Sequence, residues 1–152
     1  MPLADAPRRI GTLCLRFPSQ TAFLSLVRDV TKKLAEIAGF DEATADRLAL
    51  AVDEATTNVI KHAYHGVPDQ PVELRFEDRG EEFRVDVFDS GDTVDPRSMP
   101  QVEIERFVTE RRKGGLGVHL MERIMDSVTY RRTARRNVCC MVKRKDSPLD
   151  EP

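Results

Sequence analysis

The chain has 152 residues, 40% of them hydrophobic, so it is long enough for one domain whose core needs no metal or disulfide support. Its 24 basic and 26 acidic residues nearly cancel, which removes any global electrostatic case for a nucleic-acid or anionic-membrane partner. The three cysteines, Cys14, Cys139 and Cys140, lack the spacing of a zinc site or a disulfide framework. No apolar run approaches the roughly 18 residues of a membrane span, and we expect a cytoplasmic protein.

Two elements are predicted before residue 40. Residues 10–17 alternate imperfectly between apolar and polar, which predicts a strand that Pro18 ends. Ser19 is then placed to cap a helix. Apolar residues recur at helical spacing over about residues 20–38, and Gly39 supplies a C-terminal stop.

A second helix and a hairpin follow. Asp41 is placed to begin this helix, which its pattern carries to about Tyr64 before a glycine and a proline end it. Residues 71–91 contain two alternating runs on either side of 78–81, which is typical of a β-hairpin whose second strand ends at Asp89. The stripe of the helix predicted to be buried consists of Leu48, Val52, Ala55 and Val59.

The last part of the chain mixes a polar connection with ordered elements. Residues 90–113 are polar and charged, and a connection of this length is usually functional or mobile, so we treat them as a candidate lid. A glycine-rich turn then opens an apolar helix over 114–126, and residues 127–145 predict a second hairpin. We expect one domain over residues 1–145 and a disordered tail over residues 146–152.

One polar ridge runs along the second predicted helix. Glu54, Asn58 and His62 follow one another at intervals of four residues, about one helical turn, so their side chains stack. Taken alone, such a ridge is most often the solvated face of an amphipathic helix. The alternative is a reaction site, because an amide oxygen is a neutral ligand for Mg²⁺ and a carboxylate can accept a proton. We expect His62 to be a structural polar residue rather than a catalyst.

Three segments together point to a nucleotide site. "DEATTN" contains Glu54 and Asn58 on a predicted helix, "DSG" at 89–91 ends a predicted strand, and "GGLG" at 114–117 opens a helix. In this order they resemble the N, G1 and G2 boxes of the GHKL, or histidine-kinase-like, ATPases. The segments "DEATTNVIKHAY" and "GGLGVHLMERIMD" and the short length resemble most the anti-sigma-factor serine/threonine protein kinases of bacterial partner-switching systems.

The resemblance implies a fold and roles for four residues. The fold is an α/β (α+β) two-layer sandwich with helices on one face of a mixed, mainly antiparallel sheet, the Bergerat ATP-binding fold. Asn58 would coordinate Mg²⁺ bound to the phosphates of ATP, and Glu54 would accept the proton of the substrate hydroxyl. Asp89 would accept a hydrogen bond from the adenine amino group, and Gly91 would let the backbone approach the base closely.

The resemblance also implies a phosphate-binding turn. Its backbone N–H groups and the N-terminus of the following helix would face the phosphates, where the positive end of the helix dipole favours anions. A lysine before the glycines would add a charge. The residues concerned are Lys113, Gly114, Gly115, Leu116 and Gly117.

Two features depart from the common pattern of these families. Thr93 stands where the wider fold often has a second glycine, and Lys113 stands where arginine is frequent, although lysine cannot make arginine's two-pronged phosphate contact. Four arginines of the second predicted hairpin are expected to form a solvated or partner-facing edge rather than a nucleic-acid patch: Arg131, Arg132, Arg135 and Arg136.

The implied function is that of an anti-sigma factor and ATP-dependent serine/threonine protein kinase. It would bind Mg-ATP and phosphorylate an anti-anti-sigma antagonist protein. A sigma factor would be the sequestered client, engaged by a homodimer, with no direct nucleic-acid or membrane partner. The alternative is a nucleotide-binding regulatory module that sequesters a partner protein without kinase activity. Glu54 favours the kinase, although the same carboxylate could activate water in a plain ATPase.

Overall fold

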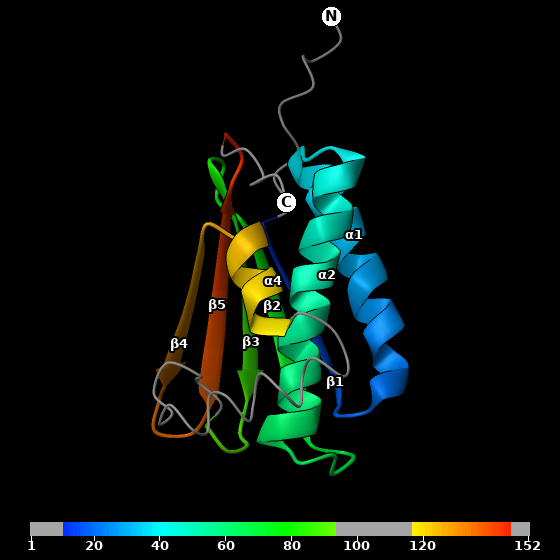
Figure 1. The fold of residues 1–152 in the computed structure, drawn as a ribbon, viewed down its shortest axis with the longest axis vertical. Coiled ribbons are helices and arrows are strands. Elements are labelled where there is room, and N and C mark those ends of the chain that lie inside the picture. Colours follow the sequence, from blue (N-terminus) through cyan, green and yellow to red (C-terminus); the bar gives the residue numbers. More distant parts are fainter. Residues whose placement is uncertain (1–10, 94–116, 147–152) are drawn as a thin grey trace, which may run out of the picture.

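Among the residues that the structure describes, 11–93 and 117–146, five strands form one sheet in the order β1-β2-β3-β5-β4. The structure is a computed structural model. Every strand pairing in these residues is antiparallel, and Figure 1 shows the strands as one layer. The strands are β1 (Thr12–Pro18), β2 (Pro71–Asp78), β3 (Glu82–Asp89), β4 (Ser127–Arg132) and β5 (Asn137–Arg144).

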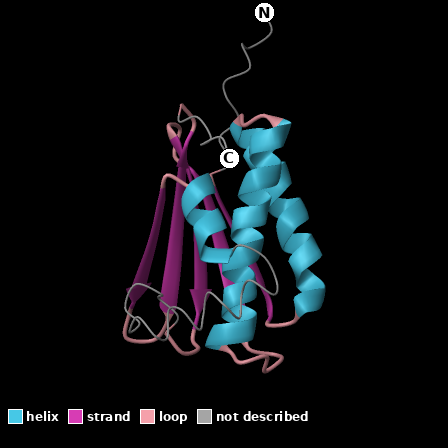
Figure 2. Ribbon diagram, in the orientation of Figure 1, coloured by secondary structure: helices cyan, strands magenta, loops and turns pink. Residues whose placement is uncertain are grey.

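The described helices lie on one face of this sheet, as Figures 1 and 2 show. Helix α2 packs against α1 on one side and against α4 on the other. This arrangement confirms the predicted two-layer α/β (α+β) sandwich. The helical elements are a 3₁₀ turn at Thr21–Phe23, α1 (Leu24–Ala38), α2 (Glu42–Asn58), a π-helical segment at Val59–Ala63, and α4 (Gly117–Ile124).

Two predicted segments lie largely outside the described residues. Of the candidate lid at 90–113 only 90–93 are described, and of the tail at 146–152 only Asp146. The division into one domain and a tail therefore stays a prediction. In the described ranges, no helix combines the length and the apolar character that crossing a membrane requires.

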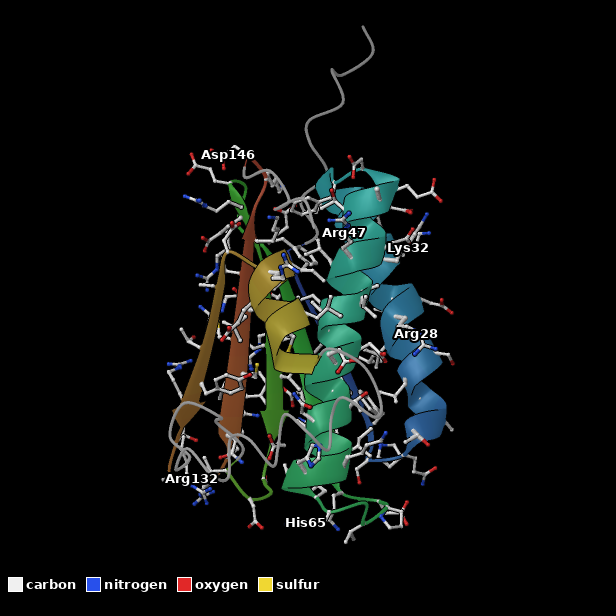
Figure 3. All side chains as sticks on the ribbon, viewed as in Figure 1. Arg28, Lys32, Arg47, His65, Arg132 and Asp146 are labelled. Atoms are coloured by element: carbon white, nitrogen blue, oxygen red, sulfur yellow. The ribbon has the colours of Figure 1, made fainter. Side chains whose placement is uncertain are left out.

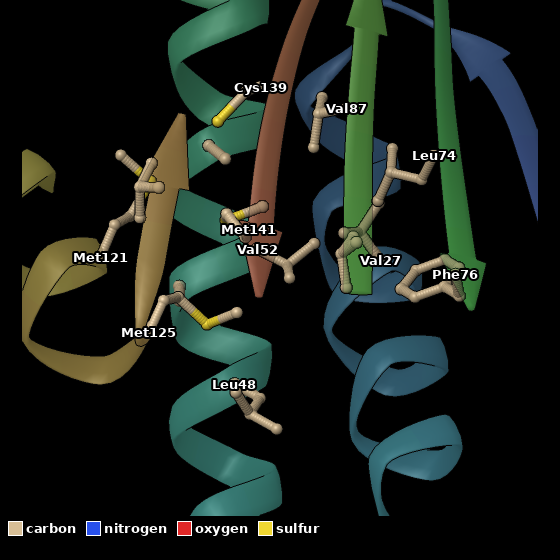
Figure 4. Close-up of a cluster of buried hydrophobic side chains, with 14 of the residues drawn as sticks. Val27, Leu48, Val52, Leu74, Phe76, Val87, Met121, Met125, Cys139 and Met141 are labelled. Carbon is tan, nitrogen blue, oxygen red and sulfur yellow. The ribbon is translucent and has the colours of Figure 1, made fainter. Parts of the chain in front are cut away.

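The hydrophobic core lies between the sheet and the helices. Leu48 and Val52 of α2 and Val27 of α1 are fully buried, and they face the strands. Each such side chain contributes about 1.5–3 kcal/mol of burial free energy, so this layer holds α2 against the sheet. The whole predicted stripe of α2 is buried, as expected. Other labelled core residues in Figure 4 are Leu74, Phe76, Val87, Met121, Met125, Cys139 and Met141.

Local signals set the start of α2 and the end of α1. Asp41 precedes α2, and its Oδ1 accepts a hydrogen bond from the backbone N–H of Thr44 at 2.7 Å. Gly39 follows α1 with φ of 106°, a left-handed conformation that glycine adopts without a steric cost. Both predictions are confirmed.

The predicted cap at Ser19 is wrong. Helix α1 begins at Leu24 without a side-chain cap, and a 3₁₀ turn precedes it. The hydroxyl of Ser19 instead donates to the carbonyl of Val67 at 2.7 Å and accepts from the N–H of Gln70 at 3.0 Å. The serine therefore ties the end of β1 to the loop before β2.

Both predicted hairpins form, β2–β3 and β4–β5. The strand register has one consequence for function. Asn137, the first residue of β5, lies opposite Asp89, the last residue of β3, and also opposite Arg132, the last residue of β4. One end of the sheet therefore brings three polar residues together.

Candidate functional site

A cavity of about 240 Å³ lies at this end of the sheet, between the C-terminal end of α2 and the strands β3, β4 and β5. Asn58 lines its helix side, and Asp89 and Asn137 line its sheet side. Arg132 also lines the cavity, and in Figure 3 it lies at the same end of the molecule as His65. The other described lining residues are Ala55, Val59, Thr93, Tyr130, Arg131, Val138 and Cys139.

Asn58 is the last residue of α2, and it is buried with 7% of its surface exposed. Its Oδ1 atom has no hydrogen-bond partner among the described residues. A buried acceptor without a partner costs about 1–3 kcal/mol, so a structure that retains one has a use for it. Asn58 also lines the cavity, and an amide oxygen is a suitable ligand for a hard cation. The solvated-face interpretation of the ridge is therefore wrong for Asn58.

The helix changes its pitch directly after Asn58. Val59–Ala63 form a π-helical turn, which is rare and recurs at functional sites. The N–H of Tyr64 donates to the carbonyl of Val59 at 2.9 Å across this wider turn. His62, in the same turn, is half-buried. The wider turn places His62 differently from the simple four-residue stacking predicted over Asn58.

Asp89 ends β3 and is buried with 5% of its surface exposed. Its Oδ1 accepts from the backbone N–H of Gly91 and from Nδ2 of Asn137, both at 2.9 Å. Burial raises the pKa of Asp89, and the hydrogen bonds from Asn137 and Gly91 and the charge of Arg132 oppose that rise. Its Oδ2 has no hydrogen-bond partner in the described ranges, so this acceptor is open to a ligand.

Gly91 passes very close to the end of the π-helical turn that follows α2. A Cβ atom at this position would lie 2.4 Å from the carbonyl oxygen of Ala63. The next residue, Asp92, donates its backbone N–H to that same oxygen at 2.9 Å. Glycine is therefore required here by the close approach of two backbones, and the approach fixes the loop after Asp89.

We expect Gly91→Ala to lower the free energy of unfolding by about 1–3 kcal/mol, because a backbone atom rather than a flexible side chain blocks the added methyl. The loop must move, which displaces Asp89 and weakens ligand binding in the cavity. Denaturant unfolding measures the first effect. Ser90→Ala, at the exposed neighbouring position, is the control and should unfold like the wild type. Equal stability of Gly91→Ala and the wild type would contradict the close approach.

Tyr64 holds the same loop from a second direction. Its hydroxyl donates to the carbonyl of Pro71 at 2.6 Å and accepts from the N–H of Ser90 at 2.8 Å. Burial is the main cause that raises the pKa of the Tyr64 hydroxyl. The residue after Asp89 is thus anchored to the start of β2 and to the end of the π-helical turn.

Arg132 and Thr93 line the cavity on the side of the β4–β5 hairpin. The Nη1 atom of Arg132 donates to Oγ1 of Thr93 at 2.7 Å and to Oδ1 of Asn137 at 3.3 Å. The sequence marked Thr93 only as a departure and Arg132 only as part of an edge. It gave no reason to single out Asn137 or Tyr64, because both act through pairings between distant strands and turns.

Glu54 lies one turn before Asn58 on α2 and is half-buried. The preceding acid, Asp53, has a different role, because its Oδ1 accepts from Nη1 of Arg28 on α1 at 3.1 Å. Of the two adjacent acids, Asp53 therefore ties α2 to α1. Glu54 is the acid that lies four residues, about one helical turn, before Asn58.

The predicted phosphate-binding turn is described only at its last residue. Lys113, Gly114, Gly115 and Leu116 lie outside the described residues, whereas Gly117 is the first residue of α4. In Figure 1 the first turn of α4 is nearer than its last turn to the cavity end of the sheet. The N-terminus of α4 therefore points toward the end where Asp89 and Asn137 lie.

No group of three or more His, Cys, Asp or Glu side chains within the described residues is arranged to hold a metal ion by itself. A cation at Asn58 would take its other ligands from water and from a bound anion. Mg²⁺ characteristically binds in this way, through one or two protein oxygens together with phosphate oxygens. The donor set at Asn58 fits Mg²⁺ delivered with a nucleotide.

Comparison with known proteins identifies the family of this chain. Residues 17–143 match the family described as "Histidine kinase-like ATPase domain". "Serine-protein kinase RsbW" from Listeria innocua serovar 6a is 32% identical over 120 residues, which are 76% of each chain. The protein of the same name from Bacillus subtilis strain 168 is 30% identical over 118 residues, 75% of this chain and 74% of the relative.

A solved structure supports the fold. The crystal structure of the RsbU and RsbW domains of Rv1364c from Mycobacterium tuberculosis covers 88% of this chain with a TM-score of 0.61 and 17% identity. This chain spans 31% of the length of that one.

The fold and the cavity are those of a nucleotide-binding ATPase domain, and the chain belongs to the histidine kinase-like ATPase family. Within that family it belongs with the RsbW serine-protein kinases. The resemblance to the anti-sigma-factor kinases of the GHKL superfamily is confirmed.

Proposed function

We propose that this protein binds Mg-ATP in the cavity between α2 and the sheet and transfers the γ-phosphate to a serine or threonine of an anti-anti-sigma antagonist protein. The protein also sequesters a sigma factor, and it does so as a homodimer. Its membership of a family of protein kinases supports the phosphotransfer. One observation on this chain carries the proposal most directly: Asn58, whose amide oxygen has no partner among the described residues, lines the same cavity as Asp89.

Asp89 is proposed to recognise adenine. Oδ2 of this buried residue would accept a hydrogen bond from the 6-amino group of the base. Guanine presents a carbonyl oxygen at the same position, and two facing acceptors repel each other. The carboxylate of Asp89 therefore favours adenine in two ways: it attracts the amino group of adenine, and it repels the carbonyl oxygen of guanine. Gly91 supports the contact, since its lack of a side chain lets the loop hold Asp89 in place.

The phosphates are proposed to lie between Asn58 and the start of α4. Bound Mg²⁺ would neutralise charge on the phosphate oxygens, and Asn58 would supply it with one protein ligand. The N–H groups around Gly117 would face the anion at the positive end of the helix. Lys113, Gly114, Gly115 and Leu116 are proposed to complete this contact.

Glu54 is proposed to be the general base. It would accept the proton of the substrate hydroxyl while the hydroxyl oxygen forms a bond to the γ-phosphorus and the bond from that phosphorus to ADP breaks. Its place one helical turn from Asn58 puts the base beside the proposed metal ligand.

The direct test is incubation of the purified protein with γ-labelled ATP, Mg²⁺ and small candidate antagonist proteins. We expect label to appear on a serine or threonine of one antagonist. ATP binding by calorimetry without any label transfer would favour the alternative, a regulatory module that sequesters a partner without kinase activity. Absence of ATP binding would contradict both.

Asp89→Asn is expected to weaken ATP binding by about 1.5–3 kcal/mol, because a charge-assisted hydrogen bond to the adenine amino group is lost. Discrimination against GTP should fall as well, since the amide can turn a donor toward the base. Isothermal titration with both nucleotides measures the two effects. Asp92→Asn, an exposed carboxylate in the same loop, is the control and should bind both nucleotides like the wild type. Unchanged ATP affinity in folded Asp89→Asn would remove Asp89 from the base pocket.

A further inference from the structure

Asn137 lies where three chain segments meet at the cavity. It begins β5, with Asp89 of β3 on one side and Arg132 of β4 on the other. It is buried with 9% of its surface exposed. Its Nδ2 donates to Oδ1 of Asp89 and to the carbonyl of Gly91, each at 2.9 Å. One amide group thus holds both the carboxylate and the loop that follows it.

The donor and acceptor ends of this amide have different neighbours. Oδ1 of Asn137 accepts from the guanidinium of Arg132 at 3.3 Å, and that guanidinium also binds Oγ1 of Thr93 at 2.7 Å. A guanidinium has no acceptor, and a carboxylate has no donor. Only one orientation of the amide satisfies both neighbours, with Nδ2 toward Asp89.

This orientation fixes the carboxylate of Asp89. The two hydrogen bonds that Asp89 receives in the described residues, from Asn137 and from the N–H of Gly91, both end on Oδ1. Rotation of the carboxylate would break both bonds at once. Oδ2 of this cavity-lining residue is therefore held in one position before any ligand arrives, which removes an ordering cost from binding.

We infer that Asn137 is a positioning residue for nucleotide selection: it aims Oδ2 of Asp89 at the 6-amino group of adenine and so sets the preference for that base. The inference rests on the proposed contact between Asp89 and adenine. It gives a role to a residue that the sequence did not mark.

A merely structural role is the competing explanation, because Asn137 also ties the β4–β5 hairpin to the loop after β3. The two explanations differ in which ligands are affected. A structural tether supports every nucleotide equally. A positioning residue for the 6-amino group affects only nucleotides that carry this group.

The test is a cycle of variants and ligands in the full chain. Affinities for ATP and for purine riboside triphosphate, which lacks the 6-amino group, are measured by calorimetry with Mg²⁺. We expect Asn137→Ala to weaken ATP binding about tenfold, the effect of one hydrogen bond to a charged group, and to leave the affinity for the analogue nearly unchanged. Thr133→Ala is the matched control, because Thr133 bonds within the same hairpin turn, to Arg136, and not to Asp89.

A second variant keeps the shape and changes the donor. In Asn137→Asp the introduced carboxyl faces Asp89, and two carboxylates this close share a proton as the pH falls. The shared proton restores one donor to Oδ1 of Asp89. We expect ATP affinity relative to the wild type to be lowest near pH 8 and to recover in part near pH 6. Arg132 and Tyr64, whose charges interact with that of Asp89 within the described residues, are present in both proteins.

Two results would overturn the inference. The first is an equal loss of affinity for ATP and for the analogue in Asn137→Ala, with the variant folded by its thermal unfolding curve. The second is a pH-independent affinity ratio for Asn137→Asp. The parallel measurement on Asp89→Asn separates this inference from the proposed function. If Asp89→Asn binds ATP normally, the role of Asp89 itself has failed. If only Asp89→Asn weakens binding, the role of Asn137 alone has failed.

Discussion

Glu54→Gln is expected to bind Mg-ATP like the wild type and to phosphorylate the antagonist about 10²–10⁴-fold more slowly, the range that a general base contributes. Glutamine keeps the shape of the side chain and is a good helix former, so α2 should remain intact. It lacks the basic oxygen that takes the hydroxyl proton. A single-turnover assay with labelled ATP, at saturating nucleotide, measures the chemical step separately from binding.

Asp53→Asn is the matched control for this variant. Asp53 is adjacent to Glu54 in the chain, but its carboxylate is engaged with Arg28 of α1. The substitution removes an acid of the same helix turn without touching the proposed base, so phosphotransfer should stay close to the wild-type rate. A normal rate in Glu54→Gln would reject Glu54 as the base, and equal losses in both variants would indicate a general charge effect of the helix.

The fold was readable from the sequence where local chemistry decides it. Asp41 and Gly39 mark helix ends because a carboxylate binds a free N–H and a glycine adopts a left-handed φ, and neither effect needs a distant partner. Both hairpins follow from alternating runs. Ser19 failed as a cap because its hydroxyl has two partners about 50 residues away in the chain, which local reasoning does not see.

The site was readable only in part, for the same physical reason. Asn58 and Asp89 stand in recognisable segments, and the structure brings them to one cavity. The contacts that orient them depend on strand register. Asn137 meets Asp89 across 48 residues of chain, and Arg132 meets Thr93 across 39. The apolar pattern of one strand does not predict which residue of a neighbouring strand will lie opposite a given residue.

Helical spacing alone also did not predict whether Asn58 would be buried or exposed. The ridge pattern allows either a solvated face or a site, because periodicity assigns residues to a face without saying what covers that face. The strands β3, β4 and β5 settle the question, because they enclose the cavity that Asn58 lines. The π-helical turn after Asn58 left no signal in the sequence, although it helps to bring the backbone of Ala63 against Gly91.

Asn58→Ala is expected to lower the affinity for Mg-ATP and the rate of phosphotransfer together, with the largest loss at low Mg²⁺, because the cation loses its protein ligand. The free protein should behave differently. The amide oxygen has no partner among the described residues, so its removal ends a desolvation cost of about 1–3 kcal/mol, and the free variant should unfold no more easily than the wild type. A purely structural asparagine would show the opposite pattern, a loss of stability with normal metal dependence.

Calorimetry across a magnesium series, paired with denaturant unfolding of the free protein, separates the two patterns. Asn58→Asp is the informative companion, because it retains an oxygen ligand at the same position. We expect it to require less Mg²⁺ than Asn58→Ala for half-maximal nucleotide binding. If Asn58→Ala binds Mg-ATP with the wild-type magnesium dependence, the amide is not a metal ligand. The buried oxygen at the end of α2 would then need a different explanation, and the phosphates would have to be placed elsewhere in the cavity.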